Sequence, residues 1–246
     1  MTALLQVQDL YKIHSGSGEE QPVLRGVSFD VEASEFVCIM GPSGSGKTTL
    51  LHLLSGLDEP SAGTVVLAGQ DLAKAKEEER TLQRRSQVGY VFQFFHLMPN
   101  LSVLENIGLP LAIAGQSPDK DEPRIRALGQ KLGIQDRLDA FPHELSGGEM
   151  QRASIARALI GGQPLLLCDE PTGNLAQAAG REVMEELKRA NVEEGRTVVL
   201  VTHNPRDAAF ADRVLFLVDG ELSDVTVSGA DVSESEVISA LQRLSI

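Results

Sequence analysis

Phe-Val-Cys-Ile-Met-Gly-Pro-Ser-Gly-Ser-Gly-Lys-Thr, Phe36–Thr48, is the stretch of sequence that decides the fold. It begins with an uninterrupted apolar run, which is typical of a strand covered on both faces in a parallel sheet. A glycine-rich loop follows, and after it come leucines at helical spacing: Leu50, Leu53, Leu54 and Leu57. The order strand, glycine-rich loop, helix predicts an α/β fold with a phosphate-binding loop.

The loop itself fits the pattern G-x-x-x-x-G-K-[ST]. Glycines allow backbone N–H groups to approach phosphate oxygens closely, and the N-terminus of the following helix adds partial positive charge. Lys47 supplies a point charge for the β- and γ-phosphates, and Thr48 offers a hydroxyl to Mg²⁺. The predicted nucleotide-binding residues here are Gly41, Ser43, Gly44, Ser45, Gly46, Lys47, Thr48 and Thr49. Kinases, GTPases, helicases and transport ATPases share this loop, so it predicts nucleotide binding only.

Further apolar runs alternate with helical segments along the chain. The expected strands are Val27–Val31, Phe36–Met40, Gly63–Leu67, Val88–Phe92, Pro164–Cys168, Thr197–Thr202 and Val214–Val218. Residues 94–159 interrupt them with helical patterns, which predicts an inserted helical subdomain, and 74–85 is a charge-dense helix candidate. We predict one domain over 1–227, then an acidic linker and a short C-terminal helix over 228–246 that docks on the same domain.

Charge and hydropathy limit the partners. The formal net charge of −13 argues against nucleic acid, because a phosphate-rich polymer would be repelled. No apolar stretch approaches the ~18–20 residues that span a bilayer, and the N-terminus lacks a signal-peptide pattern. The chain is therefore expected to be cytoplasmic, with any membrane role exerted through a partner.

Leu145-Ser-Gly-Gly-Glu-Met-Gln-Arg152 distinguishes this chain from other nucleotide-binding proteins. Ser146 and Glu149 fit a capping box, and two glycines at the start of a helix expose N–H groups to an anion. The segment resembles the signature sequence of ATP-binding cassette (ABC) proteins. That resemblance implies head-to-tail pairing, in which Ser146, Gly147 and Gly148 of one chain face the γ-phosphate held by Lys47 of the other.

The remaining motifs appear in the same order as in that family. Leu165–Pro171 resembles the Walker B strand, which delivers Asp169 to Mg²⁺ and Glu170 to the attacking water as general base. By resemblance, His203 is the switch histidine and Gln93 is the Q-loop residue that contacts Mg²⁺ or water. Tyr11 falls where the family stacks an aromatic ring on adenine, although a tyrosine at a strand end is equally typical of core packing.

The resemblance covers about residues 4–222 and implies a P-loop NTPase (RecA-like) core with an antiparallel β subdomain and the inserted helical subdomain. Gln93–Pro99, Leu101–Asn106 and Glu170–Leu175 are similar to the subgroup serving lipoprotein release, macrolide export and cell division. The expected function is Mg²⁺-dependent ATP hydrolysis by a homodimer bound to integral membrane permease subunits at the inner face of the cell membrane. Two alternatives remain open: a non-hydrolytic or weakly hydrolytic ATP-dependent signalling module, and a soluble ABC ATPase of DNA repair or translation.

Some positions depart from the family pattern. Ala176 replaces an aspartate that helps to connect the two composite sites, Asn204 replaces an aspartate after the switch histidine, and Ser34 replaces a glycine. The apolar cluster Phe94–Pro99 either lines a groove for a helix of a membrane subunit or packs inside the helical subdomain.

Overall fold

The computed structural model describes residues 3–16, 19–229 and 232–246. Its strands are β1 (Ala3–Gly16), β2 (Glu19–Glu32), β3 (Phe36–Met40), β4 (Ala62–Leu67), β5 (Gln70–Asp71), β6 (Val88–Val91), β7 (Leu165–Asp169), β8 (Thr197–Thr202), β9 (Arg213–Val218) and β10 (Glu221–Ser228). Its α-helices are α1 (Lys47–Leu54), α2 (Glu77–Gln87), α3 (Val103–Ile113), α4 (Pro118–Lys131), α5 (Gly147–Leu159), α6 (Gln177–Glu194), α7 (Pro205–Ala208) and α8 (Glu234–Leu244). Two 3₁₀ turns, η1 (Gln135–Arg137) and η2 (Pro142–Glu144), precede α5.

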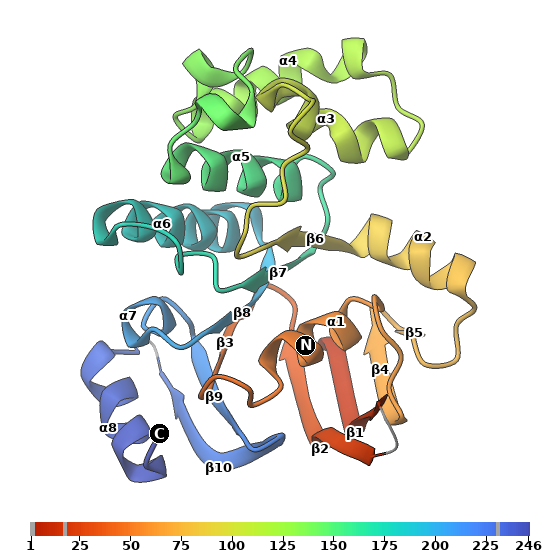
Figure 1. Cartoon of the computed structure of the whole chain (residues 1–246), viewed down its shortest axis with the longest axis vertical. Helices are drawn as coiled ribbons and strands as arrows, with labels where there is room; N and C mark the ends of the chain where they lie inside the picture. Colours follow the sequence, from red (N-terminus) through yellow and green to blue (C-terminus); the bar gives the residue numbers. More distant parts are fainter. Residues whose placement is uncertain (1–2, 17–18, 230–231) are drawn as a thin grey trace.

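Two sheets organise these elements (Figure 1). The core sheet has the order β10-β9-β3-β8-β7-β6, and its strands from β9 to β6 are parallel. The second sheet is antiparallel, with the order β2-β1-β4-β5. The fold class predicted from the sequence, an α/β core with an antiparallel β subdomain and helices inserted between β6 and β7, is confirmed.

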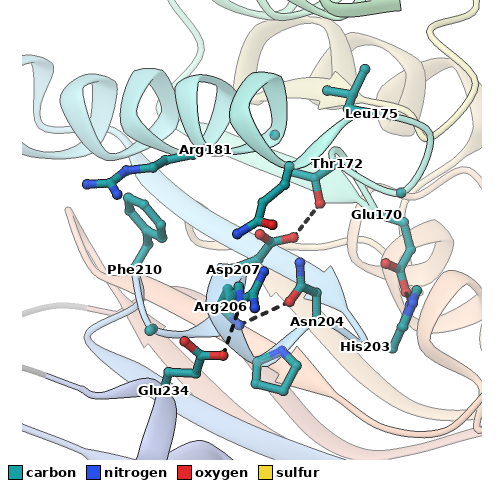
Figure 2. A pocket seen from close by; sticks show the side chains of 15 residues that line it. Glu170, Thr172, Leu175, Arg181, His203, Asn204, Arg206, Asp207, Phe210 and Glu234 are labelled. Atoms are coloured by element: carbon teal, nitrogen blue, oxygen red, sulfur yellow. Dashed lines mark hydrogen bonds and ion pairs between the residues drawn. The ribbon is translucent and has the colours of Figure 1, made fainter.

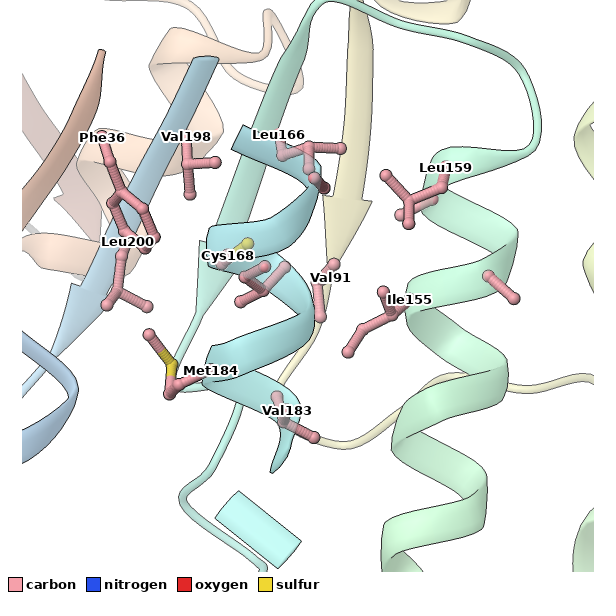
Figure 3. Close-up of a cluster of buried hydrophobic side chains, with 14 of the residues drawn as sticks. Phe36, Val91, Ile155, Leu159, Leu166, Cys168, Val183, Met184, Val198 and Leu200 are labelled. Carbon is pink, nitrogen blue, oxygen red and sulfur yellow. The ribbon is translucent and has the colours of Figure 1, made fainter. Parts of the chain in front are cut away.

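The central strands are apolar throughout because both faces of the core sheet are covered. In β3, Val37 and Ile39 pack with α1 and the antiparallel sheet, whereas Cys38 and Met40 face the opposite side. That opposite side is covered by α6 and by the helices of the inserted segment, as Figure 3 shows around β7 and β8. The same alternation continues in β7 and β8, so the sheet forms a rigid layer that fixes where its strand ends lie.

Several local predictions are corrected in detail. Leu57 is not on the helical stripe: α1 ends at Leu54, and Leu57 is 49% exposed. The physical reason is Gly56, whose left-handed φ of 68° ends the helix. The charge-dense helix lies at 77–87 rather than 74–85.

The C-terminal residues form a helix that packs on the domain. In α8, Val237 is fully buried in the core cluster, with Leu241 and Leu244 packed against it. β10 continues to Ser228 and α8 begins at Glu234, so the linker is shorter than expected; Ala230 and Asp231 lie outside the described residues. Among the residues that the structure describes, no helix combines the length and hydropathy of a membrane-spanning segment.

Candidate functional site

The glycine-rich loop connects β3 to α1 at the carboxyl end of the core sheet. Gly46 is the N-cap of α1 with φ 102°, a conformation that favours glycine. A Cβ on Gly41 would lie 2.0 Å from the carbonyl oxygen of Leu217, so only glycine fits there. The Lys47 ammonium donates to the carbonyls of Gly41 (2.8 Å) and Pro42 (2.9 Å), and the lysine is almost fully buried. Burial lowers the pKa of Lys47, while Glu170 and Asp169 oppose that shift.

Thr48 and Asp169 bring the loop and β7 together. The Thr48 hydroxyl donates to Asp169 Oδ1 at 3.3 Å, across 121 residues of sequence. Burial raises the pKa of Asp169, and the Thr48 hydrogen bond partly offsets this. A hydroxyl and a carboxylate are hard oxygen ligands, so this pair can bind a cation such as Mg²⁺ when phosphate and water complete its shell.

Glu170 and His203 form the next layer of the site. Glu170 Oε1 lies 2.8 Å from His203 Nδ1, and the Thr202 hydroxyl donates to Glu170 Oε2 at 3.2 Å. Glu170 has a left-handed φ of 46°, which is unfavourable for a side chain with a Cβ and is found mostly where surrounding structure holds it. Its N–H donates to Val201 at 2.9 Å, so the neighbouring strand fixes this conformation and aims the carboxylate.

The segment after β6 is held from two directions. Asn174 donates to the Gln93 carbonyl at 3.0 Å, and the Gln93 side-chain nitrogen is 3.1 Å from where a Cβ on Gly173 would lie. On the other side, the Arg157 guanidinium of α5 donates to the carbonyls of Phe95 (2.7 Å) and His96 (2.5 Å).

Both residues that Arg157 holds are in the left-handed region. Phe95 has φ 59° and His96 has φ 48°, and the His96 N–H donates to the Phe94 carbonyl. This is the hydrogen bond of a classic γ-turn, which is a rare and strained conformation. Burial lowers the pKa of Arg157, and poor solvation strengthens its contacts to the two carbonyls.

The signature segment begins α5 as the capping box predicted. Ser146 is the N-cap, its Oγ accepts from the Glu149 N–H at 3.3 Å, and the Glu149 carboxylate accepts from the Ser146 N–H at 2.8 Å. Gly147 lies beside Leu175, and Gly148 lies beside Ala179 of α6. The signature segment of this chain therefore borders the start of α6, and its exposed Ser146 is available to a second molecule.

A cavity of about 840 Å³ lies beside the Glu170–His203 pair, between α6, α7 and the start of α8 (Figure 2). Thr172 donates a very short hydrogen bond to the buried Asp207, and Arg206 pairs with Glu234 at 3.3 Å. Burial raises the pKa of Asp207. These polar groups were not identified from the sequence, because no motif marks them and the Thr172–Asp207 pair is 35 residues apart.

The predicted residues thus divide into three groups. The phosphate loop, Asp169, Glu170 and His203 meet at the ends of adjacent strands, with Gln93 next to them. The signature residues lie apart, at the start of α5. Tyr11 is 41% exposed opposite Arg25 in the β1–β2 pairing, with its ring against Gly26, and its contact with adenine stays a prediction.

The sequence profile of the family described as ABC transporter matches residues 24–173, more than half of the chain. The chain belongs to the ABC transporter family.

Relatives of this cassette agree with that assignment. It is 47% identical over 220 residues to the lipoprotein-releasing system ATP-binding protein LolD 2 of Caulobacter vibrioides, covering 89% of this chain and 95% of the relative. It is 42% identical over 222 residues to YxdL, an ABC transporter ATP-binding protein of Bacillus subtilis, covering 90% and 86%. The macrolide export ATP-binding/permease protein MacB of Escherichia coli is also 42% identical over 90% of this chain, but the cassette spans only 34% of that protein.

Solved structures show the same architecture. The dimeric ABC transporter cassette MJ0796 superposes with a TM-score of 0.85 at 36% identity, covering 91% of this chain and 98% of that one. Its post-hydrolysis state bound to ADP and Pi gives a TM-score of 0.83 at 35% identity, with the same coverage. The predicted family and subgroup are confirmed, and the cassette is the ATP-binding, ATP-hydrolysing component of a transport system.

Proposed function

We propose that two copies of this cassette close around two ATP molecules and that ATP hydrolysis reopens them. Lys47 and Thr48 of one copy and Ser146 and Gly148 of the other would hold the same terminal phosphate. Closing and opening would drive export or extraction of a substrate, of the lipoprotein or macrolide type, through integral membrane permease subunits. The cassette would then be cytoplasmic, peripheral to the inner face of the cell membrane.

One observation carries this proposal: a single chain brings together only some of the motif residues with which this family binds the terminal phosphate. Lys47, Thr48, Asp169, Glu170 and His203 converge, whereas Ser146 caps a helix that borders α6 instead of the phosphate loop. A second copy placed head to tail would supply the missing donors. The similar cassette MJ0796 is dimeric, which supports the pairing of two copies.

The phosphate loop suits an ATP polyphosphate. The Ser45 hydroxyl oxygen is buried without a hydrogen-bond partner among the described residues, and a phosphate oxygen would provide one. The Lys47 ammonium donates to two main-chain carbonyls of the loop, and it can exchange them for phosphate oxygens with little movement of the ammonium group.

Thr48 and Asp169 fit Mg²⁺ by the chemistry of their donors. Across the described part of the chain no cluster of three or more metal-binding side chains occurs, which suits an ion that takes one carboxylate, a hydroxyl, phosphates and water. Gln93, which contacts Asn174 and lies against Gly173, would contribute its side-chain oxygen to the same ion. Mg²⁺ bound there would neutralise charge on the β- and γ-phosphates. The raised pKa of Asp169 indicates a carboxylate whose charge is poorly solvated until a cation arrives.

Glu170 is the proposed general base. Contacts to Thr202 and His203 orient both of its oxygens, so the carboxylate can accept a proton from a water that attacks the γ-phosphorus. As the water oxygen bonds to phosphorus, the bond to the ADP oxygen breaks and phosphate leaves. His203, at 2.8 Å, would hold Glu170 and the phosphate in register.

The segment after Gln93 would transmit the change to the membrane subunits. Phe94 is 65% exposed and Met98 is 44% exposed, whereas Leu97 packs against the core. Exposed apolar side chains beside the Q-loop suit the apolar face of a helix from a permease.

Glu170→Gln tests the function directly. We expect a stable dimer with ATP-Mg²⁺, measured by light scattering, and ATP hydrolysis slowed by roughly 10²–10⁴-fold. Glu185→Gln, which removes a carboxylate from the exposed face of α6, is the matched control and should behave as wild type. A Glu170→Gln chain that hydrolyses ATP at the wild-type rate, or stays monomeric with ATP and the membrane partner present, contradicts the proposal.

A further inference from the structure

The first turn of α5 places a carboxylate on the hydroxyl that should receive a phosphate. The Ser146 hydroxyl donates to Glu149 Oε2 at 2.7 Å, and the same carboxylate oxygen accepts from the Ser146 N–H at 2.8 Å. The Ser146 hydroxyl proton is therefore bonded to an anion of its own chain.

Arg137 holds the other oxygen of that carboxylate. Its Nε donates to Glu149 Oε1 at 2.8 Å, from the turn η1, which precedes the signature segment. Hydrogen bonds from the Ser146 hydroxyl and N–H, followed by the one from Arg137, lower the pKa of Glu149 to about 2. The carboxylate is thus ionised near neutral pH, and Arg137 is the cation that pairs with it.

We propose that the Glu149 carboxylate accepts the Ser146 hydroxyl hydrogen bond that the terminal phosphate must accept in the dimer. The negative charge of Glu149 and the positive charge of Arg137 then together set the affinity of ATP-dependent dimerisation. This rests on the proposed function, because Ser146 must face the phosphate held by Lys47 of the other copy. Arg137 is a positioning residue in this scheme: it touches Glu149 and acts through it.

Glu149 and a phosphate oxygen compete for the same Ser146 proton. A phosphate oxygen that accepts from Ser146 must displace Glu149 Oε2, after which two anions lie on either side of the same hydroxyl. Arg137 reduces their repulsion, and because it binds Oε1 it keeps the carboxylate in place when Oε2 is released. At a separation of about 3–4 Å, two like charges solvated by water change the affinity at one composite site by a factor of about five to ten when one of them is removed.

The capping role of Glu149 can be separated from its charge. Glutamine satisfies a capping box as well as glutamate does, so Glu149→Gln should leave the start of α5 folded. Arg137→Lys preserves the cation and is the conservative variant. Arg126→Gln, which breaks the exposed Arg126–Glu122 pair of α4, changes the net charge by the same amount as Arg137→Gln and is the matched control.

The experiment measures the dimer dissociation constant of the full chain by sedimentation equilibrium. It uses the Glu170→Gln background with saturating ATP-Mg²⁺. Because each dimer contains two such contacts, the factors multiply, and we expect roughly 30- to 100-fold tighter dimerisation for Glu149→Gln and roughly 30- to 100-fold weaker dimerisation for Arg137→Gln. The variant with both changes should return to within about threefold of the parent, as should Arg137→Lys.

Each other result counts against the inference. If Glu149→Gln leaves the constant unchanged or weakens the dimer while its thermal unfolding matches the parent, Glu149 does not compete with phosphate. If Arg126→Gln weakens the dimer as much as Arg137→Gln does, the effect is one of net charge. A parent that stays monomeric overturns the proposed function and this inference together, whereas a dimeric parent whose constant no variant changes overturns this inference alone.

Discussion

Ala176 occupies the N-cap of α6 without a side chain that can cap it, and Ala176→Asp should stabilise the nucleotide-free protein. The residue has φ −62° and ψ 149°, the extended conformation that an N-cap aspartate adopts, and no side-chain cap bond is present. The first turn of α6 carries no acidic residue either. Because Ala176 is exposed, a carboxylate there would stay solvated and would carry no burial penalty.

The magnitude follows from the helix end. Exchange of alanine for a capping side chain at this position contributes about 0.5–2 kcal/mol, typically ~1. The negative charge at the N-terminus of the helix is part of that gain, since its interaction with the helix dipole is worth about 0.3–1 kcal/mol. For a chain of 246 residues, ~1 kcal/mol in the free energy of unfolding corresponds to roughly 2–4 °C in Tm.

Two assays separate capping from communication between sites. Thermal unfolding without nucleotide should show a higher Tm for both Ala176→Asp and the control Ala176→Ser, since serine also caps a helix. Steady-state ATP hydrolysis should show a higher rate or a higher Hill coefficient for aspartate alone, because the family's aspartate is the group expected to connect the two sites.

Capping and communication between the sites have separate tests. A Tm for Ala176→Asp that equals or falls below wild type would refute the capping argument. Unchanged rate and cooperativity would refute the idea that Ala176 weakens the connection between the composite sites.

Three further predictions concern other parts of the site. Arg157→Gln should cost about 1.5–3 kcal/mol in the free energy of unfolding and lower kcat, because a charged donor to two carbonyls is lost; thermal unfolding and steady-state kinetics, with Arg157→Lys for comparison, measure both. Phe94→Asp should abolish transport in reconstituted vesicles and leave the ATPase rate of the isolated chain unchanged, since Phe94 is largely exposed; an unfolded variant would indicate internal packing instead. Burial raises the pKa of Asp207 above 3.8, so the folded state binds this proton more tightly and stability falls as pH rises through that raised pKa. Asp207→Asn removes this pH-dependent loss of stability, so the Tm of the variant should exceed that of wild type at pH 7. The difference in Tm should shrink as the pH is lowered, and a difference that does not depend on pH would contradict this prediction.

Local patterns predicted the strands, the phosphate loop and the acids of the site for a physical reason. β7 up to Asp169 and β8 between its two terminal threonines are apolar at every position, so their places in a covered parallel sheet follow from hydrophobicity alone. In a parallel sheet the carboxyl ends of neighbouring strands lie together, which brings Thr48, Asp169 and Glu170 to one edge. Extending the helical stripe to Leu57 failed because the pattern of leucines ignored the helix stop at Gly56.

Long-range polar contacts were beyond what the sequence can predict. Arg157 reads as one more basic residue on a helix, and only the fold brings it to carbonyls 61 and 62 residues away. Thr172 and Asp207 meet in the same way, as do Asn174 and Gln93. Hydrophobic periodicity specifies which face of an element is buried, but it carries no information on which distant polar residue becomes a hydrogen-bond partner in the fold.

The hydrogen bonds from Arg157 to the carbonyls of Phe95 and His96 determine where the helical insertion can bend relative to the core sheet. If the helices of the insertion rotated relative to the segment Phe94–His96, the charge-assisted hydrogen bonds from Arg157 to that segment would break. The strained turn at Phe95 would then lose the contacts that hold it. The segment Phe94–His96 therefore moves together with α5. The backbone torsions that allow a rotation of the insertion must then change at Phe92 and Gln93, just after the end of β6. With the pivot of the insertion at Gln93, a rotation of a few degrees would move Gln93 least and the distant α3 and α4 most.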